Sequence, residues 1–551
     1  MNKNLNKILI VLLSLSIIIS VFSSFYFQKD AFLSNDNEQH FYDMRRGYDT
    51  KIIPHTGARL VTSGKIIDEN AVRVPGAGFY ARFISLYSLS NGNYYTARIL
   101  DVSLYLIILF IFLIWIYFRF GLMAFSILAA FIGVNCVFFE AVTSFTNPNP
   151  VVSFSFLFVI FFAEYLRDCK YSKVFAALLF PILAIMGQFH FAVYYGIVPT
   201  LIIYLIIRFN YSKKYFAYLF LGVFISFLLY LPYLIVEIQN GFENSLRMIN
   251  LSKEYTVPFY KRFPQISAQI VFTTFTLNKF DVKTILNFWG IVSPLMIIII
   301  AVSYIIAASS FIVSFICIIL KKDINKDIFK EVKFKNDKLL KELLFFYFLY
   351  IPIAIICPMV LKGKGGGYVY HFSMFAMSFF TILLFANYLY YKKPKLFNYF
   401  IIFMFIHIFA VSWHYYKQNY KFSLIGKKQR LTYDIVKHIG FNANGESFKL
   451  YSRDIFDYAA WLFLNEKENT ISENHNIEYL IIENTNSVLY RFNDDDRIKE
   501  REPHKALTLY YWYSPVNKPN TKDTSGDFDL NNSILIYTNE LFGVYKKELK
   551  Q

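Results

Sequence analysis

Residues 102–118 read VSLYLIILFIFLIWIYF and contain no charged side chain. A helix of about 20 such residues crosses the hydrocarbon layer of a bilayer, and apolar blocks of similar length recur along this chain. Of the 551 residues, 56% are hydrophobic, 20% are aromatic and only 17% are charged. Water-soluble domains carry a larger share of charged residues than this. The sequence therefore predicts a polytopic membrane protein.

About eleven blocks are long and apolar enough to be membrane helices. We interpret the first, residues 8–27, as a retained helix and not a signal peptide, because it is long, lacks a small-residue cleavage site and is followed by further spans. The block at 288–320 is longer than one span needs, but the lysine-rich connection after it favours a single helix. The predicted spans are 8–27, 102–118, 120–139, 151–166, 174–186, 191–207, 215–236, one within 288–320, 343–361, 372–391 and 399–413.

The net charge of +17 would suggest nucleic-acid binding in a soluble chain, but membrane loops offer a simpler explanation. Basic residues gather at alternate connections, which the positive-inside rule places in the cytoplasm, whereas residues 140–150 and 187–190 carry no Lys or Arg. No nucleic-acid partner is expected, and anionic membrane lipids are expected to contact the basic loops. The basic connections hold Arg119, Arg167, Lys170, Lys173, Arg208, Lys213, Lys214, several lysines within 321–341, Lys392, Lys393 and Lys395.

Three long polar regions then fall on the extracytoplasmic side: residues 28–101, 237–287 and 414–551. The first is a large loop with two turn motifs, IIPHTG at 52–57 and VPGAGF at 74–79. The last combines a helical pattern from Phe456 with strand patterns from Ile477, Ala506 and Ser533. We therefore predict a membrane domain at 1–413 and a small C-terminal α/β extracytoplasmic domain at 414–551.

Three acidic residues, Asp36, Glu38 and Asp43, follow the first predicted helix in the segment LSNDNEQHFYDMRRGYD. A general base must be a carboxylate or histidine held within hydrogen-bond reach of an acceptor hydroxyl, and these acids stand where the bilayer surface begins. The same spacing also fits a solvated start of a loop. Spacing alone leaves both interpretations open.

The first loop resembles that of bacterial transferases of the GT-C superfamily, in the protein O-mannosyltransferase and lipid A aminoarabinose transferase group (glycosyltransferase family 39-like). The resemblance implies that Asp36 or Glu38 is the catalytic base, with Asp36 favoured. It departs from the family where Asn37 splits the acidic pair and where Arg73 precedes Val-Pro in place of Lys-Pro-Pro. Later segments beginning at Phe138, Gly187 and Leu231 resemble uncharacterised members of the superfamily. The matching segments of the first loop are Asp36-Asn37-Glu38, Pro54 with Gly57, residues 73–80, and Ala97-Arg98.

Several polar residues map to the extracytoplasmic ends of predicted helices, where an ionisable group costs energy unless it is paired or faces water. One interpretation is that they line an outward substrate cavity together with Asp43. The alternative is that each only caps or solvates a helix end. These residues are Glu140, Gln188, His190 and Glu237.

The segment LKGKGGGYVYHF at 361–372 breaks the charge rule, because it places Lys362 and Lys364 on the extracytoplasmic side. Its glycines permit close backbone approach. Related transferases use basic residues of a late outer loop to hold the lipid phosphate, so both lysines, with Arg73, are candidates for the donor phosphate. His371 is added to the candidate cavity. The alternative is a flexible basic loop at lipid head groups, and the pattern of a nucleotide-binding P-loop is not met.

The resemblance implies an inverting, mannosyltransferase-like glycosyltransferase of the bacterial inner membrane, active on the extracytoplasmic side. Its donor would be a polyprenyl-phosphate sugar and its acceptor a glycan, lipid or protein of the cell envelope. Phosphate is a good leaving group that needs cationic stabilisation more than a strong acid, so one carboxylate suffices, whereas glycoside hydrolysis uses two. No cofactor is expected, and a requirement for a divalent cation stays open. The alternative is a non-catalytic transporter or flippase partner, which would tolerate loss of Asp36 and Glu38.

Overall fold

The computed structural model describes residues 3–31, 35–59, 72–254, 264, 294–318, 337–360, 372–443, 446, 448–452, 476–483, 533–538 and 542–548. Contacts between residues divide the chain into two units. The membrane unit comprises Met1–Gln28, Gly47–Leu60 and Val72–Gln418, and the second unit comprises Lys29–Arg46, Val61–Ala71 and Asn419–Gln551. Each unit is described below by itself.

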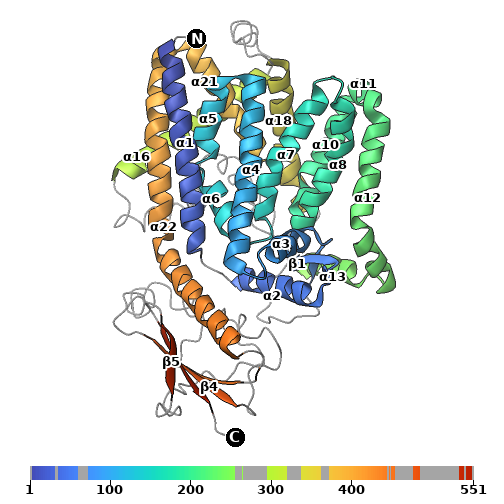
Figure 1. Cartoon of the computed structure of the whole chain (residues 1–551). Helices are drawn as coiled ribbons and strands as arrows, with labels where there is room; N and C mark the ends of the chain where they lie inside the picture. The colour runs from blue at the N-terminus through green and yellow to red at the C-terminus, as the bar shows by residue number, and fades with distance from the viewer. Residues whose placement is uncertain are drawn as a thin grey trace. The chain divides into compact units, whose positions relative to one another are not determined.

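The membrane unit is a bundle of long helices with shorter ones between them (Figure 1). The long helices are α1 (Lys3–Lys29), α4 (Tyr94–Phe120), α7 (Asn149–Leu166), α8 (Ser172–Phe189), α12 (Phe216–Gln239), α16 (Pro294–Ile318), α18 (Asp337–Val360) and the first part of α22 (Pro394–Ala443). The shorter helices are α3 (Gly78–Leu89), α5 (Leu122–Ile132), α6 (Cys136–Thr143), α9 (Ala192–Tyr195), α10 (Ile197–Ile207), α11 (Phe209–Ser212), η1 (Lys213–Tyr215), α13 (Glu243–Glu254), α20 (Phe375–Ser378) and α21 (Phe380–Lys392).

The predicted polytopic helical membrane architecture is confirmed. Among the described residues, 8 helices are long and apolar enough to cross a membrane, or 9 if the bent pair α5 and α6 forms one span. The three other predicted spans each consist of two shorter helices: α5 with α6, α9 with α10, and α20 with α21. Asn135 starts α6 by accepting a hydrogen bond from the Val137 amide at 2.8 Å, and α5 and α6 meet there at 63°.

Close helix contacts in the bundle depend on small residues, as is usual between membrane helices. At Gly222 of α12, an added Cβ would lie 2.7 Å from the Ala177 carbonyl oxygen of α8, so only glycine allows this approach. On α1, the buried Ser16, Ser20 and Ser24 share one face at four-residue spacing. A Cβ at Gly133, between α5 and α6, would lie 3.3 Å from the Cβ of Ser20, so these small side chains let α1 pack closely against the break.

Buried ion pairs join the helices at the end of the bundle where α11 lies (Figure 1). Glu164 of α7 accepts hydrogen bonds from Trp115 Nε1 at 2.6 Å and from Arg119 Nε at 2.7 Å, both on α4. Glu342 of α18 accepts from Arg208 Nη2 at 2.9 Å. Several basic residues that the charge pattern assigns to the cytoplasmic side therefore also hold the bundle together.

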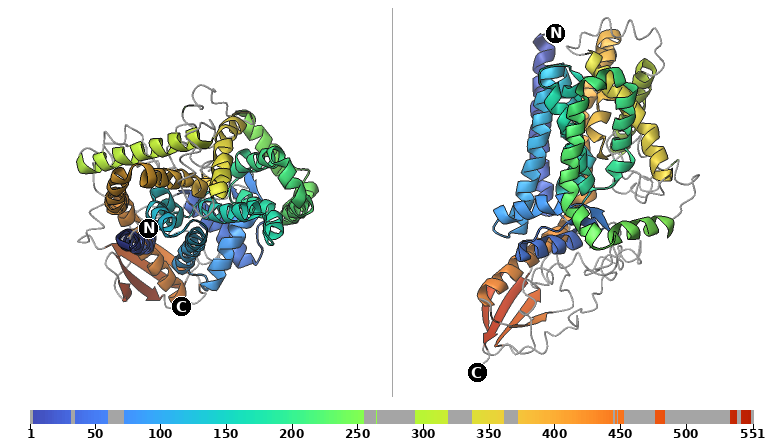
Figure 2. Two further views of the ribbon diagram at one scale, coloured as in Figure 1. Left: turned by 90° about the horizontal axis from the view of Figure 1, so that it is seen from above. Right: turned by 90° about the vertical axis from the view of Figure 1, so that its right-hand side faces the viewer.

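The other end of the membrane unit carries a small β-ribbon and two helices that run across the bundle direction (Figure 2). The ribbon pairs β1 (Thr56–Arg59) with β2 (Arg73–Pro75) in antiparallel register. Helix α3 follows β2 directly, and α13 follows α12. This end contains the sequence motifs of the first loop that fall in the membrane unit.

The second unit contains a four-stranded sheet in the order β3-β4-β6-β5. Strand β3 (Phe448–Ser452) is parallel to β4 (Ile477–Glu483), whereas β6 (Phe542–Glu548) is antiparallel to both β4 and β5 (Ile534–Thr538). The strands predicted near Ile477 and Ser533 are present. The helix predicted from Phe456 and the strand from Ala506 lie outside the described residues.

The chain reaches this sheet without a break in α22, which continues past the predicted domain boundary at residues 413 and 414. Tyr479 of β4 donates a hydrogen bond to Asn442 Oδ1 of α22 at 2.9 Å and so ties the sheet to the end of that helix. Most of α2 (Asn35–Thr50) is also grouped with this unit. The division at residue 413 stays a prediction.

Candidate functional site

Two arginines and one aspartate form a buried charged group at the β-ribbon end of the membrane unit, which we call the arginine cluster: Arg82, Arg98 and Asp101. Arg82 comes from α3, and the other two come from the first turns of α4. Asp101 forms ion pairs with both arginines, and its distance to Arg82 Nη1 is 2.7 Å. Arg98 Nη2 also donates to the Val142 carbonyl oxygen at 2.9 Å. The side chains are 11%, 2% and 0% exposed, respectively.

The arginine cluster has one more positive than negative charge. Arg82 Nε has no hydrogen-bond partner among the described residues. Burial acts to lower the pKa of Arg82, but Asp101 and Tyr105 outweigh it and hold the pKa above its ordinary value. A buried excess charge is costly unless a counter-charge accompanies it, so this arrangement favours an anion close to Arg82.

Aromatic rings surround both guanidinium groups. Arg82 Cζ lies 5.3 Å from the ring centroid of Tyr105, and Arg98 Cζ lies 5.6 Å from that of Phe145. Arginine placed over aromatic faces gains electrostatic stabilisation, which is larger where water is excluded. The rings therefore help the fold to tolerate two buried cations at this position.

The turn before α3 is held by Gln188, which lies in the last turn of α8. Gln188 Oε1 accepts a hydrogen bond from the Gly78 amide at 2.8 Å, and its Nε2 donates to the Leu229 carbonyl oxygen of α12 at 3.1 Å. Gly76 has φ +89°, and a Cβ there would lie 2.5 Å from Gln188 Cγ. Glycine is therefore required at residue 76 both by the backbone and by the side chain against it. A place for Gln188 in the substrate cavity stays a prediction.

Glu237, another predicted cavity residue, is buried at the end of α12 and faces the start of α13. Its carboxylate accepts hydrogen bonds from the Ser245 amide at 2.9 Å and the Asn244 amide at 3.3 Å, and also from the Ser245 hydroxyl. A carboxylate at a helix N-terminus satisfies unpaired amides and interacts favourably with the helix dipole. Its observed contacts are thus those of a helix cap, which was the alternative interpretation.

Arg73, a predicted phosphate ligand, is linked to α13 through its backbone. Its amide donates to Asn244 Oδ1 at 2.9 Å, and its carbonyl oxygen accepts from Asn244 Nδ2 at 3.1 Å. The side chain donates to the Gly57 carbonyl oxygen at 3.4 Å. His55 lies within electrostatic range of Arg73 and Glu237, and burial and Arg73 lower its pKa, while Glu237 acts to raise it.

His190 follows α8 directly. Its Nδ1 accepts a hydrogen bond from the Ala192 amide at 3.2 Å, and its ring stacks on Phe191. Burial lowers the pKa of His190 to about 3, so the imidazole is neutral near pH 7 and is a weak base. Glu140 lies in α6 and is half-buried.

The remaining predicted site residues fall elsewhere. Lys362, Lys364 and His371 lie outside the described residues. Asp36 and Glu38 lie in α2, in the second unit, and their side chains are not among those described; Asp43, in the same helix, is buried. Within the described ranges, no group of three His, Cys, Asp or Glu side chains could hold a metal ion.

Sequence reasoning therefore brought Arg73, Gln188, His190 and Glu237 to one end of the bundle but missed the arginine cluster as a site. Arg98 had been noted only as part of a family motif. A signal existed, because an Arg and an Asp three residues apart at the start of an apolar helix must find partners. The sequence offered no indication that Arg82, on a different helix, would join them.

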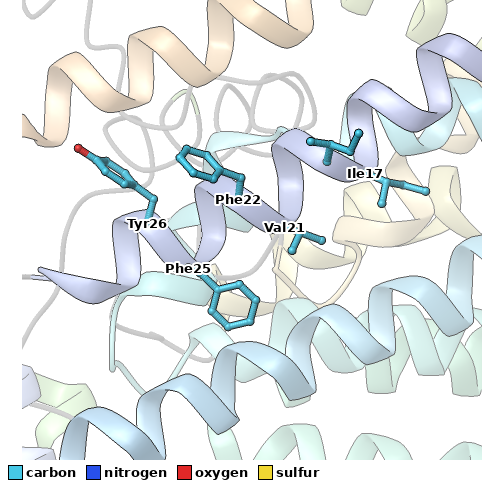
Figure 3. Close-up of a pocket in the computed structure, with 6 residues that line it drawn as sticks. Ile17, Val21, Phe22, Phe25 and Tyr26 are labelled. Carbon is cyan, nitrogen blue, oxygen red and sulfur yellow. The ribbon is translucent and has the colours of Figure 1, made fainter.

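An apolar hollow of about 670 Å³ also lies along one face of α1 (Figure 3). A single helix supplies its lining, including Ile17, Val21, Phe22, Phe25 and Tyr26. On a membrane span such a face packs against lipid chains. It contains no charged group that could orient a substrate, so we do not place the site there.

No protein-family model matches the chain, and no curated protein matches its sequence. Two solved structures are similar to it. ArnT from Cupriavidus metallidurans bound to undecaprenyl phosphate has 10% sequence identity and a TM-score of 0.46, with 97% of each chain covered. The apo state of the same protein has 11% identity and a TM-score of 0.40, again over 97% of each chain. The function proposed next rests on this chain's own residues.

Proposed function

We propose that this protein is an inverting glycosyltransferase of the GT-C type, which transfers a sugar from a polyprenyl-phosphate donor at the extracytoplasmic face of the bacterial inner membrane. The observation that carries the proposal is the arginine cluster. It combines an excess buried cation, an unpartnered Arg82 Nε among the described residues, and a position at one end of a membrane bundle. A phosphate attached to a membrane lipid presents its charge at this level of a bilayer.

In the proposed reaction, an acceptor hydroxyl attacks the anomeric carbon of the donor sugar. The bond from that carbon to the phosphate oxygen breaks, its electron pair leaves with the phosphate, and the configuration inverts. Asp36, or alternatively Glu38, takes the proton from the hydroxyl. Arg82 stabilises the departing phosphate, because a fixed cation in a water-poor site favours the developing negative charge. Arg73, Lys362 and Lys364 remain proposed ligands of the same phosphate.

The acceptor is proposed to be a glycan, lipid or protein of the cell envelope. No step requires a bound nucleotide, because the lipid phosphate is itself the leaving group. Glu140, Gln188, His190, Glu237, Asp43 and His371 keep their proposed place around the acceptor. For Gln188 and Glu237 this would be an indirect role, since their polar atoms already hold backbone groups.

The test is sugar transfer or release by the purified protein in lipid nanodiscs, using a panel of labelled polyprenyl-phosphate sugars. Asp36→Asn, Glu38→Gln and Arg82→Met are compared with wild type. Lys214→Gln is the matched control, because Lys214 is a cation at the opposite end of the bundle and is 54% exposed. Loss of turnover in Arg82→Met and in one acid variant, with the control active, supports the proposal.

A non-catalytic transporter or flippase partner is the second candidate. The observation in its favour is the 63° break between α5 and α6, since interrupted membrane helices are typical of transporters. The same panel separates the two functions. If folded protein transfers no sugar from any donor in the presence of acceptor extracts, yet polyprenyl-phosphate sugars cross proteoliposome membranes, the transport function replaces the enzymatic one.

A further inference from the structure

Helix α13 is joined to the membrane span α12 by a sharp turn at residues 240–242. Gly241 and Phe242 both adopt left-handed backbone conformations, with φ of +63° and +61°. The Phe242 amide donates to the Glu237 carbonyl oxygen at 2.6 Å, and the Glu237 carboxylate caps α13. These contacts hold α13 across the direction of α12, as Figure 2 shows.

The polar side of α13 is attached to the protein. Asn244 forms two hydrogen bonds with the backbone of Arg73 on β2, and Ser245 is bound to Glu237. Asn244 Nδ2 also lies 3.2 Å from the Tyr233 hydroxyl of α12. The orientation of the helix about its own axis is therefore fixed by bonds to two other elements.

The opposite side of α13 is apolar and exposed. Phe242 is 50% exposed, Leu246 is 54% exposed and Ile249 is 52% exposed. Their spacing of four and three residues places them on one face of the helix. On α12, Ile235 and Ile238 are likewise exposed, just before the turn. We call these five side chains the α12–α13 band.

We propose that the α12–α13 band lies in the bilayer, so that α13 is an interfacial helix with its apolar face in the boundary between head groups and lipid chains. The argument is continuity. α12 is a membrane span whose exposed side chains face lipid, and the same apolar surface continues through Phe242 onto α13. A helix that lies across the bundle with one polar and one apolar face is typical of a membrane interface.

This anchor has a consequence for the β-ribbon. Asn244 joins α13 to the backbone of Arg73, so lipid contact along the band sets the height of β2 above the membrane. The inference does not depend on glycosyl transfer, because it would hold for any membrane protein with these contacts.

The experiment measures the environment of a spin label on full-length protein in lipid nanodiscs. The four native cysteines are first replaced by serine, and one cysteine is then introduced by Leu246→Cys. Glu243→Cys is the matched control, because Glu243 is on the same helix and is 58% exposed, close to the exposure of Leu246. Collision rates are measured with oxygen, which concentrates in lipid, and with a water-soluble nickel complex.

We expect the ratio of oxygen to nickel collisions to be several-fold higher at residue 246 than at residue 243. Equal ratios that show both labels in water would overturn the proposal. A label at 246 that is immobilised and shielded from both reagents would also overturn it, because another protein segment or a second copy would then cover the band. A parallel measurement, quenching of a tryptophan from Leu246→Trp by lipids brominated on the chains, serves if the cysteine-free protein does not fold.

Discussion

The arginine cluster predicts opposite effects for two substitutions that each remove one charge. Asp101→Asn leaves Arg82 and Arg98 buried without a counter-charge, and breaking a buried ion pair in this way costs about 3–5 kcal/mol of unfolding free energy. Arg82→Met leaves the balanced pair of Arg98 with Asp101 and replaces the guanidinium with an apolar chain of similar length. We expect it to change the unfolding free energy by less than about 1 kcal/mol, because replacing a buried charge by a packed apolar group is often neutral.

Arg82→Met should instead weaken donor binding. A hydrogen bond to a charged group contributes about 1.5–3 kcal/mol. Since each 1.4 kcal/mol is a factor of ten in affinity, we expect binding of a polyprenyl phosphate to fall roughly 10- to 100-fold. The assays are denaturant unfolding in one fixed detergent and titration of a fluorescent polyprenyl phosphate into nanodiscs.

The double variant Arg82→Met with Asp101→Asn completes the cycle. It leaves Arg98 as the one charge of the cluster, so its stability should lie between those of the two single variants. If Arg82→Met destabilises the protein as much as Asp101→Asn does and leaves lipid-phosphate binding unchanged, Arg82 is a structural counter-ion of Asp101 and the reasoning is wrong.

Three further predictions concern residues around the bundle ends. Gln188→Leu strands two backbone groups and should lower the unfolding free energy by about 1–3 kcal/mol for each, measured by denaturant unfolding; an unchanged midpoint would contradict the observed bonds. The folded pKa of His190, about 3, lies below its ordinary 6.5, so wild type should lose stability as pH falls from 6.5 towards 3, and His190→Asn should remove that part of the loss in thermal unfolding measured across pH. Tyr215 and Lys214 lower the pKa of Asp168, so its contribution is present above pH 3.8 and is lost on further acidification; because the pair is half-exposed, Asp168→Asn should cost about 1 kcal/mol or less at pH 7, and a larger loss would refute the assignment.

The membrane architecture could be predicted because it depends on composition and length, which a linear sequence displays directly. Every predicted span has a helical counterpart in the structure, although three of them are divided into two helices. One division could have been anticipated, since Gly133 and Asn135 are a helix-ending and a helix-starting residue within the block at 120–139. The polar character of the helix ends was also visible.

The use of those polar residues could not be predicted. Gln188 and Glu237 were interpreted as cavity candidates, yet both bind backbone amides, because position in a sequence does not reveal which unpaired amide will lie opposite a side chain. The pairing of Arg73 with Asn244 spans 171 residues and leaves no local pattern. Arg82 joined Asp101 for the same reason. Long-range partners of this kind require the fold.

The central claim is inverting sugar transfer, and the most direct measurement is the anomeric configuration of the product. Wild-type protein in nanodiscs would be given a polyprenyl-phosphate sugar of known configuration and an acceptor, and the product would be examined by NMR spectroscopy. We predict a product of opposite configuration that is not formed by Asp36→Asn or by Glu38→Gln. A product of retained configuration, or one formed equally well by both variants, would contradict the account.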